Sequence, residues 1–178
     1  MRTKIKVKEF ARIESGIVYL DDFLLFVGDN NSGKTLLMEL IYGIVELMRS
    51  WKADWNNVKM TEREDVKFVR FDQEWYKDVE DKINLYLKEN KENFIIENFK
   101  SRIPLESVSI EFEEFENCFY IATISNTVKI EKQYPNGERV VLVDGLQASD
   151  DIKRILAHRI LIDMVGLQED EKQLFVPA

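Results

Sequence analysis

The chain has 178 residues, enough for one domain with a hydrophobic core of its own. Its formal net charge of −8 argues against a broad nucleic-acid-coating surface, which needs clustered Lys and Arg. Cys118 is the one cysteine, which excludes an internal disulfide and a cysteine-based zinc site and favours a reducing compartment. No run approaches the ~20 apolar residues of a spanning helix. We therefore expect a cytoplasmic chain with no membrane partner.

The first third of the chain predicts strands followed by a helix. Residues 4–10 alternate lysines with apolar side chains, as a half-buried strand does, and residues 16–22 form a second short run. Residues 23–28 are continuously apolar, which is typical of a strand buried on both faces. Residues 34–49 are apolar nearly all round a helix and predict a buried one.

The remainder predicts further helices and strands, although the polar stretch 50–72 gives no assignable pattern. Residues 73–99 predict a helix with Trp75, Val79, Ile83 and Leu87 on one face and a break near residues 90–93. Strands are predicted over 107–115 and 118–124, and a hairpin over 127–145, turning at Asn136-Gly137. A helix opening at residues 150–151 and stopping at Gly166, then a strand over 172–178, complete the prediction.

Residues 28–35 read GDNNSGKT and match the phosphate-loop pattern G-x-x-x-x-G-K-[ST] at every fixed position. Glycines let backbone N–H groups converge on phosphates, and the following helix presents its positive end to them. Lys34 is the predicted catalytic residue, reaching the β- and γ-phosphates, and the Thr35 hydroxyl is the predicted Mg²⁺ ligand. The alternative is a Gly/Asn-rich turn with an incidental Lys-Thr. The predicted ATP contacts are Gly28, Asp29, Asn30, Asn31, Ser32, Gly33, Lys34, Thr35 and Leu36.

The segment FVGDNNSGKTLLMELIYGI, with the upstream strands, resembles the start of an ABC-type ATPase head. More narrowly, it is similar to the SMC/RecF/OLD branch and to prokaryotic OLD-like AAA family ATPases, a group that includes subunits of antiphage defence systems. The closing QLFVPA is also similar to these proteins. The resemblance implies an α/β P-loop NTPase lobe. Its parts would be a mixed sheet around the P-loop helix, an antiparallel β subdomain and a helical insertion.

In that family the nucleotide lies between two heads, facing an LSGG-like signature and an Asp-Glu Walker B pair. The 178 residues contain no LSGG-like segment, and no strand-like apolar run in them ends in Asp-Glu. Asp144, after VVLV, is the nearest Walker B candidate, but Gly145 follows it, and the second strand of a hairpin is the favoured interpretation. The resemblance thus implies that residues 1–178 are one ATP-binding domain, the N-terminal lobe of a head. Efficient hydrolysis would need a C-terminal half and head dimerisation, and any nucleic-acid or effector-nuclease partner would bind through other regions.

Several single residues can be interpreted either as functional or as structural. By the same resemblance, Phe10 and Arg12 would contact the nucleotide; otherwise they are a core Phe and a surface Arg. His158 has no second metal-ligating partner and is expected on a helix surface, and Cys118 is expected to be a buried apolar filler. The tryptophans are expected in the core, and the acids of residues 106–116 on a solvated strand face.

Two other classes of function compete with the ATPase. A small P-loop kinase would need a lid with arginines and a base, and the arginines at hand are not placed in such a motif. A GTPase is disfavoured because the chain has no Asn-Lys-x-Asp segment. A non-enzymatic module that senses nucleotide without turnover remains open.

Overall fold

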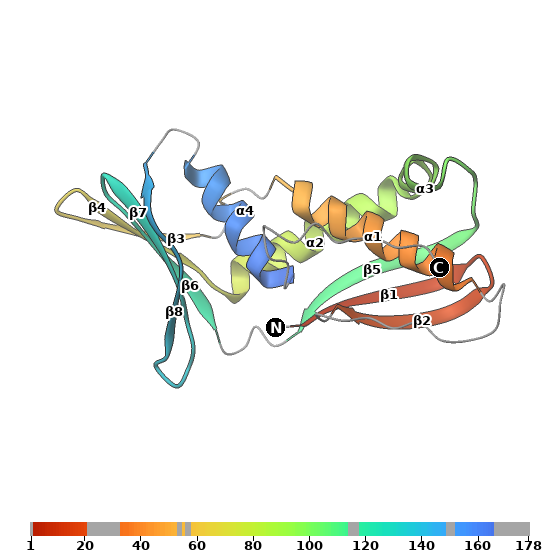
Figure 1. Cartoon of the computed structure of the whole chain (residues 1–178), viewed down its shortest axis with the longest axis horizontal. Helices are drawn as coiled ribbons and strands as arrows, with labels where there is room; N and C mark the ends of the chain where they lie inside the picture. The colour runs from red at the N-terminus through yellow and green to blue at the C-terminus, as the bar shows by residue number, and fades with distance from the viewer. Residues whose placement is uncertain are drawn as a thin grey trace. The chain divides into compact units, whose positions relative to one another are not determined.

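The computed structural model describes residues 2–20, 33–52, 55, 58–113, 118–148 and 152–165. These residues form four helices and two antiparallel sheets (Figure 1). The chain divides into two compact units: the first contains Met1–Trp51 and Glu80–Glu113, and the second contains Lys52–Val79 and Glu114–Leu161. The mixed α/β class is therefore confirmed. The mixed sheet that the resemblance implied around the P-loop helix is not found among the described residues, because every pairing of their strands is antiparallel. The predicted strands at 23–28 and 172–178 lie outside the described residues.

The first unit is built on a three-stranded sheet in the order β2-β1-β5. Strand β1 (Arg2–Phe10) pairs with β2 (Ile13–Leu20) on one side and with β5 (Leu105–Glu113) on the other. The alternation of apolar and polar side chains along β1 agrees with its pairing to β2 and β5. Ile5 lies opposite Val18 and Ile110, and all three side chains are buried. This face of the sheet is part of the core of the first unit.

Helices α1 (Lys34–Ser50) and α3 (Lys91–Phe99) belong to the same unit as this sheet, and α2 (Gln73–Glu89) belongs to it from Glu80 onward. Helix α1 buries an apolar face that includes Leu40, Ile44 and Met48, while Tyr42 is 40% exposed. The helix is therefore less completely buried than its composition suggested. Helices α2 and α3 meet at Asn90, which confirms the predicted break.

The apolar face predicted for α2 consists of Trp75, Val79, Ile83 and Leu87. All four side chains are buried, with at most 1% exposure, so this prediction is confirmed.

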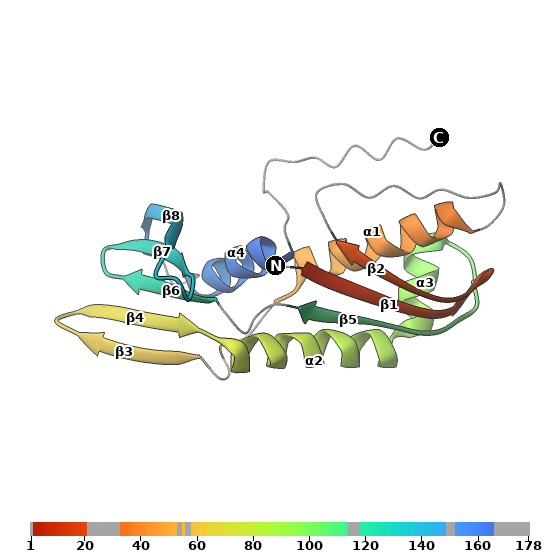
Figure 2. The ribbon, with the colours of Figure 1, turned by 90° about the horizontal axis from the view of Figure 1, so that it is seen from below.

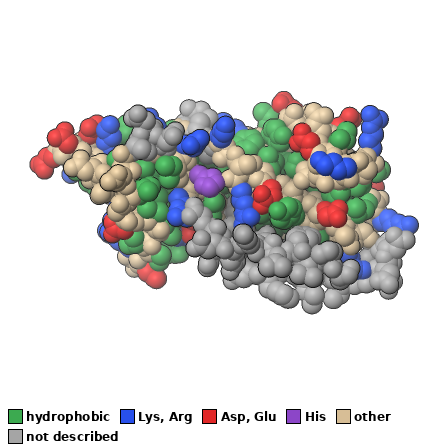
Figure 3. All heavy atoms as spheres, turned by 45° about the horizontal axis from the view of Figure 1, so that its top comes forward, with side chains coloured by type: hydrophobic (Ala, Val, Ile, Leu, Met, Phe, Trp, Pro, Cys, Tyr) green, Lys and Arg blue, Asp and Glu red, His purple; other side chains and the backbone are tan. Residues whose placement is uncertain are grey.

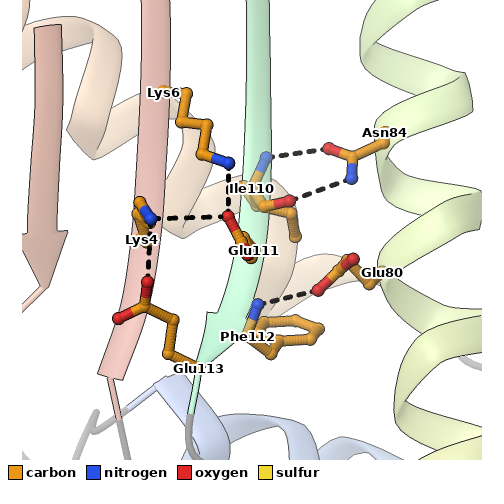
Figure 4. A network of polar contacts seen from close by, with 8 residues as sticks. All are labelled: Lys4, Lys6, Glu80, Asn84, Ile110, Glu111, Phe112 and Glu113. Atoms are coloured by element: carbon orange, nitrogen blue, oxygen red, sulfur yellow. Dashed lines mark hydrogen bonds and ion pairs between the residues drawn. The ribbon is translucent and has the colours of Figure 1, made fainter.

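Helix α2 runs along the outer edge of β5 and satisfies its backbone with side chains (Figures 2 and 4). The Asn84 amide accepts from the Ile110 N–H at 2.8 Å and donates to the Ile110 carbonyl at 2.9 Å. The buried Glu80 carboxylate accepts from the Phe112 N–H at 2.8 Å, and Lys91 Nζ donates to the Glu106 carbonyl at 2.8 Å. Polar side chains of α2 and α3 thus stand where a neighbouring strand would be.

The second unit is built on a five-stranded sheet in the order β3-β4-β6-β7-β8. Its strands are β3 (Lys59–Arg63), β4 (Val66–Phe71), β6 (Phe119–Ile124), β7 (Thr127–Gln133) and β8 (Arg139–Gln147), and most of helix α4 (Ile152–Val165) belongs to the same unit. Buried side chains on one face of the sheet, including Val69, Tyr120 and Ile130, form its core. The predicted β7–β8 hairpin is confirmed, with Gly137 at φ 85° in its turn.

Candidate functional site

The structure describes the second half of the phosphate-loop motif. Gly33 is the N-cap of α1 with φ 89° and ψ 6°, a left-handed conformation that glycine adopts without strain, and its carbonyl accepts the first helical bond from the Leu37 N–H at 2.9 Å. A Cβ at Gly33 would lie 3.6 Å from Ile13 Cγ1, an ordinary contact. The backbone angle, rather than lack of space, is therefore what requires glycine here.

The first turn of α1 is suited to an anion. It contains no acidic residue, and no side chain caps it by a hydrogen bond. Lys34 and Leu36 are half-buried and Thr35 is exposed. The helix dipole and the Lys34 charge reinforce each other at this end, whereas Arg49 in the last turn pairs with Glu46.

The first half of the motif, comprising Gly28, Asp29, Asn30, Asn31 and Ser32, lies outside the described residues. The structure therefore brings Gly33, Lys34, Thr35 and Leu36 together at one helix end, and the contacts predicted for the other five residues stay predictions.

The β1–β2 turn lies beside this helix end. Ile13 reaches Gly33, and the turn residues Ala11 and Arg12 are exposed, with Ala11 at φ 54°. The Phe10 ring is fully buried and lies 5.6 Å from the Phe99 ring centroid. This burial favours the core alternative for Phe10, whereas Arg12 remains a surface side chain on a turn that approaches α1.

The acids of β5 form ion pairs with the lysines of β1 (Figure 4). Lys4 Nζ lies 2.8 Å from Glu113 and 3.6 Å from Glu111. The hydrogen bond to Glu113 raises the pKa of Lys4, and the hydrogen bond from Lys6 lowers the pKa of Glu111. The predicted solvated strand face is therefore charge-paired. Among the described residues no three His, Cys, Asp or Glu side chains gather in a way that could hold a metal ion.

Asp144 lies in β8, the second strand of the hairpin, and is exposed. A Walker B aspartate follows a buried strand, so the hairpin interpretation is confirmed for this residue. Cys118 is buried, as predicted. His158, the chain's one histidine, lies half-buried on α4, and its purple side chain reaches the surface in Figure 3.

The tryptophans divide between core and partial exposure. Trp75 is fully buried, and its ring centroid lies 4.9 Å from that of Phe71. Trp51 and Trp55 are half-buried, and each makes one edge-to-face contact, with Tyr86 and Phe71 respectively. The core prediction therefore holds fully for Trp75 alone.

Sequence reasoning missed one pocket, which lies in the first unit. It has a volume of about 360 Å³ and is formed by the first two turns of α3 and residues 102–105. No sequence pattern links these two segments, because the pocket depends on how α3 turns back toward the start of β5.

Comparison of the chain with protein-family models, with curated proteins and with solved structures found no match in any of the three. No helix among the described residues is long and apolar enough to cross a membrane. The OLD-like resemblance thus rests on the sequence segments quoted above and on no matched relative.

Proposed function

We propose that the chain binds ATP with Mg²⁺ through residues 28–35. One observation supports the proposal: in a complete G-x-x-x-x-G-K-[ST] pattern, the second glycine is left-handed and caps a 17-residue helix that begins with the Lys and Thr of the pattern. In this arrangement the Lys34 ammonium neutralises the terminal phosphates, Thr35 ligates Mg²⁺, and the amides of the first turn add their partial positive charge. Magnesium would supply further charge neutralisation on the β- and γ-phosphates.

We further propose that the chain is part of an ABC-type ATPase head similar to OLD-like proteins, and that this ATPase acts in DNA metabolism or antiphage defence. In that setting ATP would hold two heads together. The chain alone should turn over ATP slowly, because no apolar run in its sequence ends in Asp-Glu, as a Walker B strand does, and Asp144 lies on an exposed hairpin strand. A reaction without a carboxylate to orient water lacks one of the main catalytic parts of phosphoryl transfer.

The test is a titration of the 178-residue chain with fluorescent ATP, with and without Mg²⁺, followed by competition with ATP, ADP and GTP. Saturable binding that requires Mg²⁺ and that ATP displaces better than GTP supports the proposal. Absence of binding at millimolar nucleotide would refute it. ADP release at enzyme-like rates that depends on an added acceptor would instead identify a kinase.

A further inference from the structure

The pocket in the first unit has an apolar floor and a charged mouth. Five of its eight lining residues are apolar, and two of these, Ile95 and Leu105, are buried with 3% and 8% exposure. Ile96 forms an exposed part of the wall. A volume of about 360 Å³ is at the lower end of the range for small-molecule sites, which are mostly apolar with few polar groups.

The charged side chains at the mouth determine which polar group a ligand can carry. Lys91 and Arg102 contribute two positive charges and Glu92 one negative charge. Lys91 Nζ donates to the Glu106 carbonyl, and neither Arg102 nor Glu92 forms an ion pair within the described part of the chain. A guanidinium without a carboxylate partner can form two parallel hydrogen bonds to one.

We propose that this pocket binds a small amphipathic monocarboxylate, with its hydrocarbon body on Ile95 and Leu105 and its carboxylate on Arg102. A nucleotide or another polyanion fits poorly, because the walls are aliphatic and Glu92 repels a second negative charge. An extended peptide fits less well than a small molecule, because Lys91, Asn84 and Glu80 already occupy backbone groups along the adjacent edge of β5. The site is independent of the phosphate loop, so either proposal can fail alone.

The test uses octanoate as the probe and 1-octanol as its neutral counterpart, followed by amide chemical shifts of the full 178-residue chain. For a ligand of this size we expect a Kd on the order of 1 mM. Saturable shifts should map to the amides of residues 91–96 and of Arg102, Ile103 and Leu105. Octanol should bind about tenfold more weakly, because it lacks the charge-assisted contact.

Three exposed positions provide matched variants. Arg102→Gln should weaken octanoate binding about tenfold and leave octanol binding unchanged. Glu92→Gln should strengthen octanoate binding, and Lys88→Gln, at the end of α2 and outside the pocket, should have no effect. Because all three side chains are exposed, the variants should fold.

Four results would overturn the proposal. The first is the absence of saturable shifts up to about 10 mM octanoate, which is roughly tenfold above the expected Kd. The second is equal affinity for octanoate and octanol, and the third is an Arg102→Gln variant that binds octanoate as the wild type does. The fourth is tighter binding of a short Leu-Glu peptide than of octanoate. The last result would identify a docking surface for protein segments instead.

Discussion

The two sheets protect their edge strands by different means. In the first unit, β5 has its outer edge closed by side chains of α2 and α3, with Asn84 bonding both backbone groups of Ile110. In the second unit no such side-chain closure is needed at the two edge strands. All five residues of β3 are exposed and three of them are charged. Strand β8 carries two extra residues relative to β7, which are bulges in the pairing. Charges and bulges both discourage strand addition. The first sheet should therefore depend on specific long-range contacts, and the second on local backbone geometry.

The largest effect should come from breaking the closure of β5. Asn84→Leu leaves the Ile110 N–H and carbonyl without partners, and we expect it to lower the free energy of unfolding by about 2–3 kcal/mol. Asn93→Leu, at an exposed position on α3, is the matched control and should cost less than about 0.5 kcal/mol. Urea unfolding of both variants checks this. Equal losses would show that the amide bonds do not stabilise the edge.

A second contact specific to the first unit is the close approach of α1 and α3. A Cβ at Gly43 would lie 2.5 Å from Asn98 Oδ1, so Gly43→Ala must displace the Asn98 side chain from its bond to the Phe94 carbonyl. The atoms that must move are the end of an exposed side chain, so the lost hydrogen bond and the gain in helix propensity, each worth about 1 kcal/mol, should nearly cancel.

Thermal unfolding of the pair Gly43→Ala and Gly43→Ala/Asn98→Ala checks this second prediction. The double variant should be the more stable of the two, because removing the Asn98 side chain makes room for the new methyl group. A double variant no more stable than the single one would contradict the steric explanation.

The second unit should respond to backbone strain. Gly145 in β8 has φ 80°, and an added Cβ would meet no atom within 4 Å, so Gly145→Ala should cost about 1 kcal/mol through its backbone angle alone. Gly145→Asn should cost less, because asparagine tolerates this region better. Gly16→Ala, at a position without a positive φ, is the control. Denaturant midpoints check all three, and an equal loss for Ala and Asn would argue against the strain account.

The smallest effect concerns the ion pairs between β1 and β5. The pKa of Glu111 is lowered by Lys6, so its contribution to stability is present above the ordinary value of 4.5 and is lost as pH falls through the lowered pKa. The pKa of Lys4 is raised by Glu113, so its contribution is present below 10.5 and is lost as pH rises above that value. Urea midpoints should fall at both extremes, and less steeply at high salt. Glu111→Gln should flatten the acid limb; an unchanged limb would assign it to other carboxylates.

Sequence reasoning found the elements with strong local signals. The alternation around Ile5, the apolar spacing from Trp75 to Leu87 and the Asn136-Gly137 turn predicted β1, α2 and the β7–β8 hairpin correctly. The β3–β4 hairpin was missed because β3 is exposed throughout and therefore lacks a hydrophobic pattern. Its turn also uses Glu64 and Asp65, both at positive φ, instead of glycine.

The candidate site was predictable only where it is local in sequence. The left-handed Gly33 and the start of α1 follow from eight consecutive residues. The burial of Phe10 against Phe99, the pairing of Asn84 with Ile110 and the pocket at Arg102 join segments distant in the chain. Periodicity and spacing hold no information about such contacts, since these depend on how the first unit packs.

ATP binding through the phosphate loop is tested most directly by calorimetry. The affinity for ATP with Mg²⁺ is measured for the wild type, Lys34→Ala and Lys52→Ala. Lys52 is an exposed lysine just beyond the other end of α1, so it matches Lys34 in charge but not in place. We expect Lys34→Ala to weaken ATP binding about tenfold or more, and Lys52→Ala to bind ATP as the wild type does. Equal affinities of the two variants, or no binding by the wild type, would contradict this expectation.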